Sequence, residues 1–510
     1  MKKIKRIAAV AAAVAVGSAS LLTFSACSNS TDKIVLRVCN WEEYVDLGEW
    51  DEEERIEIDN EYAEDGIFGE NSMVDDFVEW FNSTHDYEVQ VEYSTFGTNE
   101  DLYNRLSLGD VYDLVCPSDY MIMKLIAEGN YVDYTADFWA DNEQNYYANY
   151  VSRYIDGDEG SIYNGYGWHG KAACYMWGTL GLVYNPEEVD AEDVSSWSML
   201  LNDKYARKVT VKDNVRDAYF ATLGILNDEK LKNGGLAAEE LSAIMNDTDS
   251  ETIAAAEDIL KRIKDNVYSF ETDSGKADMV TGKVVANEQW SGDAVYIMDE
   301  AEEDGAELWY SVPEECTNIW FDGWIKLKNG VEWSERRHEA AEAFVNFLAR
   351  PDNAVRNMYY IGYTSAIAGQ TVFDYLEYNY AADEDAEETF EYDLNYFFGD
   401  GKNYSITADA SCFDIGDDNS INRGRQLFAQ YPPESVIARS VVMLDFGDKL
   451  GEINQMWINV RCLDLLDISP VTVGVTCAVI GVIAIAALLY AFRYKIFIRN
   501  NPRKGYQISK

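Results

Sequence analysis

Basic residues, histidine and proline are scarce in this chain of 510 residues. It contains 41 Lys and Arg against 91 Asp and Glu, which gives a formal net charge of −50, and it has only 3 His and 8 Pro. A surface with this excess of carboxylates repels the phosphates of nucleic acids and anionic lipids, and it raises the local concentration of cations. Binding to nucleic acid is therefore set aside.

Cysteine is also sparse, and no CxxC pair occurs among the 8 Cys. Their wide spacing argues against a metal site and a dense disulfide frame, although one or two disulfides are compatible with an extracellular location. Cys39 and Cys116 lie in apolar runs, where a small buried side chain is expected. The sequence has no GxSxG and no HExxH motif. We expect no cofactor, no metal and no catalytic residue.

Residues 1–27 have the organisation of a secretory signal. Their charges are all positive: Lys2, Lys3, Lys5 and Arg6. An apolar run from Ile7 to Phe24 follows, and two small residues precede Cys27. A Cys at this position, followed by polar residues, resembles a bacterial lipoprotein signal, so we expect lipid attachment at Cys27. The alternative is an ordinary signal peptide with an incidental Cys.

The other end of the chain has the features of a membrane anchor. Residues 468–492 contain no charged residue and are long enough to cross a bilayer. The charges in the tail 493–510 are all basic, so we expect this tail in the cytoplasm. Ten of the 41 basic residues lie in the two ends, which leaves 31 against all 91 acids in the ectodomain, a net charge of about −60. We expect a monomeric ectodomain on the extracellular or periplasmic side of the cell membrane, anchored by a lipid and one transmembrane helix.

Strand-like and helix-like segments alternate at the start of the ectodomain. Residues 33–39, 89–93 and 113–116 have strand patterns, and the spacing of apolar residues predicts helices over 73–81 and 100–108. Similar segments follow as far as residue 349. This order predicts an α/β fold with parallel, doubly wound sheets and crossover helices.

Two stretches interrupt this alternation. Residues 49–72 are acidic and are interpreted as a solvated insertion outside the core. Residues 368–430 are acidic and rich in Tyr, Phe and Asp, with weak periodicity, and are interpreted as a long second insertion. A final helix is predicted over 447–460.

Aromatic and acidic residues recur together at predicted strand ends. The segments are 40–44, 117–120, 290–293 and 320–322. Ligands of open α/β sheets bind beyond the carboxyl ends of the strands. A buried protonated amine needs a carboxylate, and aromatic faces attract cations and cover methylene chains. The recurrence predicts a slot for an elongated organic cation.

Several motifs resemble the spermidine/putrescine-binding proteins of ABC importers, over roughly 33–367 and about 435–461. They include NWEEY at 40–44, YDLVCPSDY at 112–120, WSGD at 290–293 and WFD at 320–322. The resemblance implies a type II periplasmic-binding-protein-like fold, in which two α/β lobes close on a ligand between them. Lobe 1 would comprise 28–178 and 321–367, and lobe 2 would comprise 179–320 and 368–466.

The resemblance also implies a set of ligand-binding residues. These are Trp41, Glu42, Tyr44, Ser118, Tyr120, Asp217, Trp290, Asp293, Trp320, Asp322 and Tyr363. Asp322 would be the principal carboxylate for an amine, and Asp293 matches the acid of putrescine-type members. Asn214 and Asp217 stand where spermidine-type members carry acids. Asn214 is neutral, and the side chain of Asp217 is one methylene shorter than the usual Glu, so the preference for spermidine stays open. Glu42 replaces a small hydroxyl residue and either restores a charge or faces solvent. Asp119 is interpreted as a solvated turn acid.

These features together predict a receptor that captures putrescine or spermidine outside the cell. It would deliver the ligand to the permease subunits of an ABC importer without changing it chemically. Two alternatives remain open: a receptor for another small organic cation, and a surface adhesin or sensor on the same scaffold. An enzyme such as a glycosidase is supported only by the abundance of acids.

Overall fold

The computed structural model describes residues 33–58, 60–63, 65–141, 167–168, 170–399, 402–417, 419–462 and 490. The predicted signal 1–27 with Cys27, the tail 493–510, and the apolar segment 468–492 apart from Tyr490 lie outside these residues. Within the described residues, no helix is both long and apolar enough to span a membrane. The chain divides into two units, 1–453 and 454–510.

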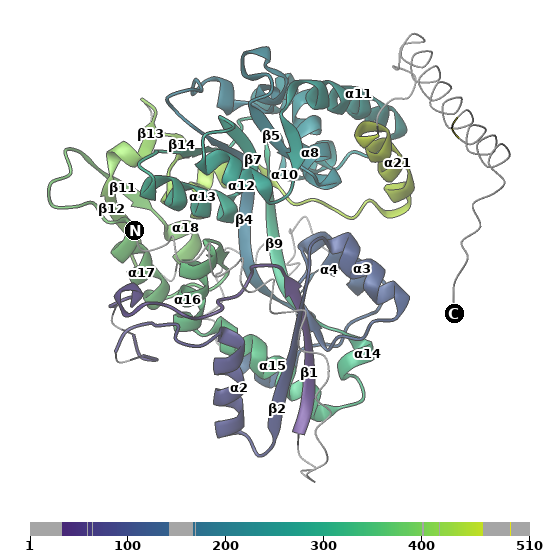
Figure 1. Cartoon of the computed structure of the whole chain (residues 1–510), viewed down its shortest axis with the longest axis vertical. Coiled ribbons are helices and arrows are strands. Elements are labelled where there is room, and N and C mark those ends of the chain that lie inside the picture. The colour runs from purple at the N-terminus through teal and green to yellow at the C-terminus, as the bar shows by residue number, and fades with distance from the viewer. Residues whose placement is uncertain are drawn as a thin grey trace, which may run out of the picture. The chain divides into compact units, whose positions relative to one another are not determined.

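One lobe is built on three parallel strands, in the lower part of Figure 1. β1 (Lys33–Trp41) pairs with β2 (Glu88–Phe96) on one side and with β3 (Leu114–Val115) on the other. Its helices are α2 (Met73–Thr84), α3 (Asn99–Leu108), α4 (Asp119–Ala127), α5 (Ala136–Asp141), α14 (Lys328–Val331), α15 (Glu335–Ala349) and α16 (Pro351–Ile361). Phe77 and Phe81 of α2 are fully buried, because residues four apart lie on the same face of a helix.

The other lobe repeats this plan in the upper part of Figure 1. β5 (Val209–Lys212) pairs in parallel with β6 (Ser269–Glu271) and β7 (Ala286–Trp290). Its helices are α8 (Val215–Leu226), α9 (Asp228–Lys232), α10 (Ala238–Met245), α11 (Ser250–Asn266), α12 (Ser274–Val280) and α13 (Ser291–Glu303). The predicted alternation of strands and helices is confirmed in both lobes.

Two long strands run through both lobes (Figure 1). β4 (Ala172–Tyr184) and β9 (Thr317–Lys326) are antiparallel partners, and every side chain in them is buried. β9 also pairs with β3, whereas the end of β4 pairs with β7 and with β8 (Trp309–Ser311). The expectation of parallel sheets was therefore wrong for these strands. A chain that leaves a lobe and later returns passes the boundary in both directions, so its crossing strands run antiparallel.

The stretch 368–430 is folded and contributes to the core. It contains α17 (Gln370–Tyr380), β11 (Thr389–Asp393), α18 (Asn395–Phe398), β12 (Ser405–Asp409), β13 (Phe413–Ile415), β14 (Ile421–Gly424) and α19 (Gln426–Gln430). β14 pairs with β8, and Phe397 stacks on Trp177 of β4 with ring centroids 5.5 Å apart. Most of its aromatic residues, which masked any clear periodicity, are buried, although Tyr378 is exposed.

The stretch 49–72 also packs on the protein. Trp50, Ile56 and Ile67 are buried, and Ile56 and Ile67 form an antiparallel bridge. The Trp50 ring lies 4.7 Å from that of Tyr359 in α16. The interpretation as a solvated insertion outside the core was therefore wrong for its apolar side chains, although acids such as Glu53 are exposed.

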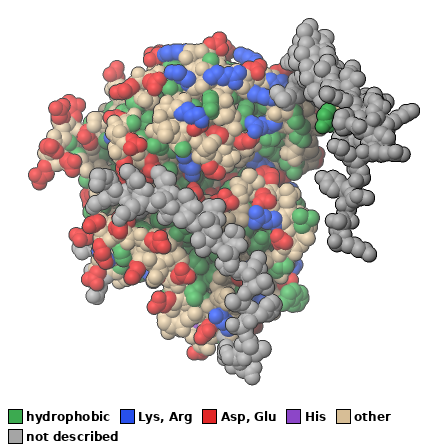
Figure 2. All heavy atoms as spheres, in the orientation of Figure 1, with side chains coloured by type: hydrophobic (Ala, Val, Ile, Leu, Met, Phe, Trp, Pro, Cys, Tyr) green, Lys and Arg blue, Asp and Glu red, His purple; other side chains and the backbone are tan. Residues whose placement is uncertain are grey.

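The remaining elements are short. They are β10 (Thr364–Ser365), α20 (Glu434–Ile437), β15 (Ser440–Val441), α21 (Leu450–Arg461) and the 3₁₀ helices Glu52–Glu54, Asp193–Ser195, Trp197–Leu201, Asp203–Tyr205, Ala410–Cys412 and Gly447–Lys449. The predicted final helix is confirmed as α21, and Cys39 and Cys116 are buried as predicted. Figure 2 shows acidic side chains over much of the visible face, with basic ones gathered in its upper part.

Candidate ligand-binding site

Asp322 lies where β9 passes from one lobe to the other. The Tyr44 hydroxyl donates to its Oδ2 at 2.7 Å, and the backbone of Ser118 forms an isolated bridge with it. Its other oxygen, Oδ1, is buried without a hydrogen-bond partner among the described residues. Burial raises the pKa of Asp322 to about 6, although the Ser118 and Tyr44 hydroxyls act in the opposite direction. The segment 320–322 is thus mid-strand, and its predicted place at a strand end was wrong.

Aromatic rings continue from Asp322 along the lobe boundary. The rings of Tyr44 and Tyr363 meet edge to face with centroids 5.0 Å apart, and Tyr363 lies 5.7 Å from Trp320. A Cβ on Gly292 would come within 2.2 Å of the Tyr363 ring, so only glycine allows this ring to lie against the start of α13. The Tyr363 hydroxyl donates to Oδ1 of Asp293 at 3.0 Å. A line of contacts therefore joins the two predicted carboxylates.

Two lysines surround Asp293. The Nζ of Lys212, from the end of β5, is 3.4 Å from Oδ2, and the Nζ of Lys276, from α12, is 3.6 Å from Oδ1. Burial alone would raise the pKa of Asp293, but the two ammonium groups outweigh it and hold the pKa below its ordinary value. The Lys212 Nζ also lies 4.0 Å from the ring centroid of Trp290. Asp293 is thus ionised and already paired.

Two further acids lie close to Lys212. Burial raises the pKa of Asp217, in the first turn of α8, to about 7, and that of Glu288, in β7, to about 8. Lys212 lowers both pKa values in part, and its backbone N–H donates to Oε2 of Glu288 at 3.0 Å. Asp217 Oδ2 and Glu288 Oε1 are buried without hydrogen-bond partners among the described residues. Near neutral pH these two acids are therefore partly protonated.

Basic side chains also bridge the two lobes. The guanidinium carbon of Arg216, from α8, lies 3.5 Å from the ring centroid of Tyr120, and its Nε is 3.5 Å from Glu100 of α3. The Nζ of Lys276 is 3.5 Å from Glu43, which follows β1. The two lobes are therefore in contact across the site in this structure.

All of the predicted residues except Glu42 fall into three groups. One group forms the continuous line of contacts: Tyr44, Ser118, Trp290, Asp293, Trp320, Asp322 and Tyr363. Asp217 joins this line through Lys212, which lowers its pKa, and Tyr120 joins it through Asn99, whose side-chain amide donates to the hydroxyls of Tyr120 and Ser118. Trp41 packs on Phe96 at 4.7 Å, with its Nε1 lacking a partner in the described part of the chain.

Glu42 follows one of its two predicted alternatives, whereas Asp119 does not behave as predicted. Glu42 is exposed and stands outside the line of contacts, whereas its neighbour Glu43 pairs with Lys276. Asp119 is buried and accepts hydrogen bonds from the backbone N–H groups of Tyr120 and Phe321, so its interpretation as a solvated turn acid was wrong.

Sequence reasoning missed Lys212, Lys276 and Arg216. Lys212 ends a strand, and the rule that ligands bind beyond strand ends would have found it. Lys276 comes from a helix, and no signal in the local sequence marks it.

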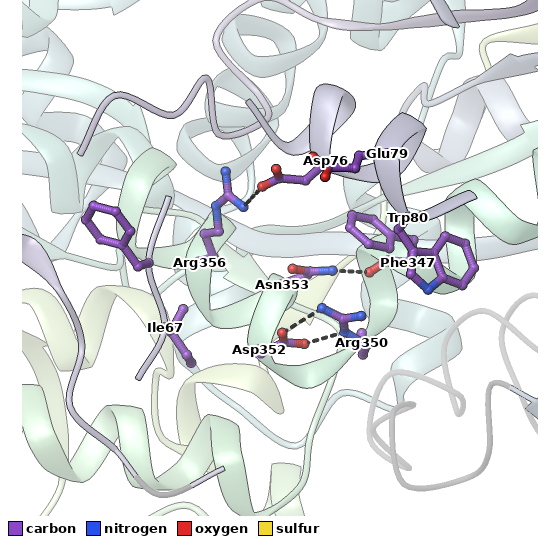
Figure 3. A pocket seen from close by; sticks show the side chains of 10 residues that line it. Ile67, Asp76, Glu79, Trp80, Phe347, Arg350, Asp352, Asn353 and Arg356 are labelled. Carbon is purple, nitrogen blue, oxygen red and sulfur yellow. Dashed lines mark hydrogen bonds and ion pairs between the residues drawn. The ribbon is translucent and has the colours of Figure 1, made fainter. Parts of the chain in front are cut away.

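A separate cavity of about 330 Å³ lies between 49–72 and helices α2 and α16 (Figure 3). Arg356 pairs there with Asp76 at 2.5 Å, and Arg350 pairs with Asp352 at 2.7 Å. Arg350 and Arg356 are thus paired with neighbouring carboxylates, whereas Asp322 between the lobes has no ion-pair partner among the described residues.

Known proteins share sequence and fold with this chain. A family model described as bacterial extracellular solute-binding protein matches residues 76–371. The spermidine/putrescine-binding periplasmic protein of Salmonella typhimurium is 25% identical over 365 residues, covering 71% of this chain and 84% of the relative. The protein of that name from Escherichia coli is 27% identical over 282 residues, covering 55% and 71%.

Solved structures share the fold. The spermidine/putrescine ABC transporter substrate-binding protein of Streptococcus pneumoniae has a TM-score of 0.52 at 21% identity, covering 84% of this chain and 98% of that chain. A putative spermidine/putrescine ABC transporter protein from Listeria monocytogenes has a TM-score of 0.55 at 20% identity, with 84% and 98% covered. The matching relatives are binding proteins and not enzymes. With more than half of its length matched by the family model, and with two lobes joined by crossing strands, this chain belongs to the bacterial extracellular solute-binding proteins.

Proposed function

We propose that this chain is the substrate-binding component of an ABC importer and that it captures an amine of the putrescine or spermidine class outside the cell. The observation that carries this proposal is Asp322, a buried carboxylate with one unpartnered oxygen, next to the rings of Tyr44 and Trp320. An ammonium group bound to Oδ1 would supply the missing partner and favour the ionised carboxylate. The neighbouring rings would cover the methylene chain of the ligand and attract its cationic end.

Closure of the lobes would couple binding to transport. The ligand would lie between elements of both lobes, so it would stabilise the form in which they meet. The pair Glu43–Lys276 and the contacts of Arg216 with Glu100 and Tyr120 belong to that form. A permease that recognises the closed form would then accept only a loaded receptor. The chain itself performs no chemistry on the ligand.

The location of the receptor is part of the proposal. The signal at 1–27 supports export and lipid attachment at Cys27, and the apolar segment 468–492 supports a second anchor. Two anchors would keep the receptor next to its permease, and the net charge of −50 would raise the local concentration of organic cations. A chain shortened before residue 468 should retain its affinity but support less uptake at low ligand concentration. Unchanged uptake would leave the second anchor without this role.

Isothermal titration of the detergent-solubilised chain tests the ligand class. Putrescine, spermidine and N-acetylputrescine should be compared, with an uncharged diol of the same length as the control. We expect binding of at least one amine and no binding of the diol. If none of the amines gives heat or competes with another, the proposal of an amine receptor is rejected.

The adhesin or sensor alternative gains no support from the two interrupting stretches. Both pack into the core of the first unit rather than forming separate contact modules.

A further inference from the structure

Lys212 occupies a position that has the chemistry of an amine-binding site. Its ammonium group lies 4.0 Å from the ring centroid of Trp290 and 3.4 Å from a carboxylate oxygen of Asp293. It also donates to the backbone oxygen of Thr272 at 2.8 Å. An aromatic face, a carboxylate and a carbonyl oxygen are the groups that recognise a protonated amine.

The position is built into the lobe. The side chain of Lys212 is 1% exposed and that of Asp293 is 9% exposed. Lys212 is the last residue of β5, and β5 pairs with β7, which ends at Trp290. The sheet therefore holds the ammonium group and the ring next to each other before any ligand arrives.

The other end of the site differs. Oδ1 of Asp322 has no partner, and none of the ion pairs found among the described residues involves Asp322. Trp320, two residues away in β9, has a buried Nε1 that also lacks a hydrogen-bond partner in the described part of the chain. The Asp322 carboxylate is thus open to a cation, whereas the Asp293 carboxylate already pairs with two ammonium groups.

We infer that Lys212 is a built-in ammonium group that fills one of the two amine positions, so that the ligand carries a single ammonium group. The ammonium of the ligand binds Asp322. Its far end is neutral and has a hydrogen-bond acceptor, which faces Lys212. This inference rests on the proposed function, because it assumes that amines bind between the lobes.

The charges explain the selectivity. A second ligand ammonium near Asp293 would meet Lys212 and Lys276, and like charges at such distances repel each other. The nearby Asp217 and Glu288 offset this repulsion only in part, because burial raises their pKa values to about 7 and about 8 and keeps them partly protonated near neutral pH. A neutral acyl group in the same place would accept a hydrogen bond from an ammonium group that is already present. A diamine acylated at one end therefore fits better than a free diamine, and a triamine fits least.

Putrescine and N-acetylputrescine test the inference, since they share one methylene chain and differ in the charge of one end. In titrations of the detergent-solubilised full chain, we expect N-acetylputrescine to bind at least tenfold more tightly than putrescine, and spermidine to bind most weakly. Lys212→Met keeps the apolar stem and removes the charge. This variant should bind putrescine at least tenfold more tightly than the wild type and should lose the preference for the acetylated ligand.

Lys283→Met is the matched control. Lys283 lies outside the site, where its ammonium group is 2.9 Å from Asp278 and 4.6 Å from the ring centroid of Tyr268, so the preference for N-acetylputrescine should change less than threefold. The wild-type comparison of the two ligands needs no variant, so it decides the question even if Lys212→Met fails to fold.

The outcomes separate this inference from the function on which it rests. Tighter binding of putrescine or spermidine than of N-acetylputrescine by the wild type would overturn the inference and leave the amine receptor standing. The same holds if Lys212→Met folds and gains no affinity for putrescine. Absence of binding for all three amines in the wild type would reject both proposals.

Discussion

The hydroxyl of Tyr44 donates a hydrogen bond of 2.7 Å to Oδ2 of Asp322, a residue 278 positions further along the chain. Tyr44 follows β1 in one lobe, whereas Asp322 lies on a strand that crosses between the lobes. The bond satisfies one carboxylate oxygen and leaves Oδ1 without a partner among the described residues. It therefore orients the carboxylate while keeping one acceptor available for a ligand.

Asp322→Asn should weaken amine binding at least about 30-fold, or about 2 kcal/mol, because the amide has nearly the same shape but cannot offset a buried ammonium charge. Titration calorimetry measures this loss. Glu42→Gln is the control: Glu42 is exposed and outside the line of contacts, so its change should have an effect below threefold. Wild-type affinity in Asp322→Asn would remove Asp322 from the site.

Tyr44→Phe should weaken binding by about 1 kcal/mol, the usual value of one lost hydrogen bond. The phenol lowers the pKa of Asp322, so its removal should raise that pKa further above the present value of about 6. The defect should then shrink as the pH rises from 6 to 8, where the carboxylate is ionised in both proteins. A defect that does not depend on pH would indicate loss of packing instead.

Affinity and stability should respond to pH in opposite directions. Protonation of Asp322 below a pH of about 6 removes the charge that binds the amine, so affinity should fall as the pH drops through 6. The pKa values of Asp322, Asp217 and Glu288 all lie above their ordinary values, so the folded state binds more protons than the unfolded state. These three groups should make the ligand-free protein more stable as the pH falls from about 8 towards 5.

Urea unfolding and titration calorimetry between pH 5 and 8 measure the two trends. Asp322→Asn should reduce the pH dependence of stability by the part that Asp322 contributes. Parallel trends in affinity and stability would contradict the assignment.

Glu342→Gln should destabilise the lobe by at most about 3–5 kcal/mol, because it removes the carboxylate of the buried Lys326, whose pKa burial already lowers to about 8. The two groups are 2.5 Å apart, and the Nε2 of His338 lies 2.9 Å from Glu342. Burial would raise the pKa of Glu342, but His338 and Lys326 outweigh it and lower the pKa to about 2. Its stabilisation is therefore complete above its ordinary pKa of about 4.5 and is lost as the pH falls towards 2.

Denaturant unfolding at neutral pH tests this pair. The matched control is Glu332→Gln, which breaks a surface pair with Lys328 at 3.9 Å and should cost less than about 0.5 kcal/mol. If the two changes reduced the free energy of unfolding equally, the buried pair would contribute no more to stability than a surface pair.

Phe397→Ala should destabilise the protein by about 3–5 kcal/mol, because its ring is buried and stacks on Trp177 of the crossing strand. Tyr378→Ala in the same stretch is the control, since Tyr378 is exposed and the change should stay within about 0.5 kcal/mol. A small effect of Phe397→Ala would restore the interpretation of 368–430 as a separate insertion.

Local patterns predicted most of the elements that surround the site. Periodicity and apolar runs located α2, α3 and the strands β1, β2 and β3, because these patterns are properties of consecutive residues. The antiparallel course of β4 and β9 was missed, since both strands are buried on both faces and show no alternation. The packing of 368–430 was also missed, because its dense aromatic residues hide any hydrophobic periodicity.

The sequence by itself determined that aromatic residues and carboxylates would meet between two α/β lobes, as Tyr44, Asp293 and Asp322 do. Only the tertiary structure decided which carboxylate is open. Lys212 and Lys276 reach Asp293 from 81 and 17 positions away, and no such partner reaches Asp322 among the described residues. The charge state of a buried carboxylate depends on its nearest neighbours in space, and the fold chooses those neighbours from distant parts of the chain.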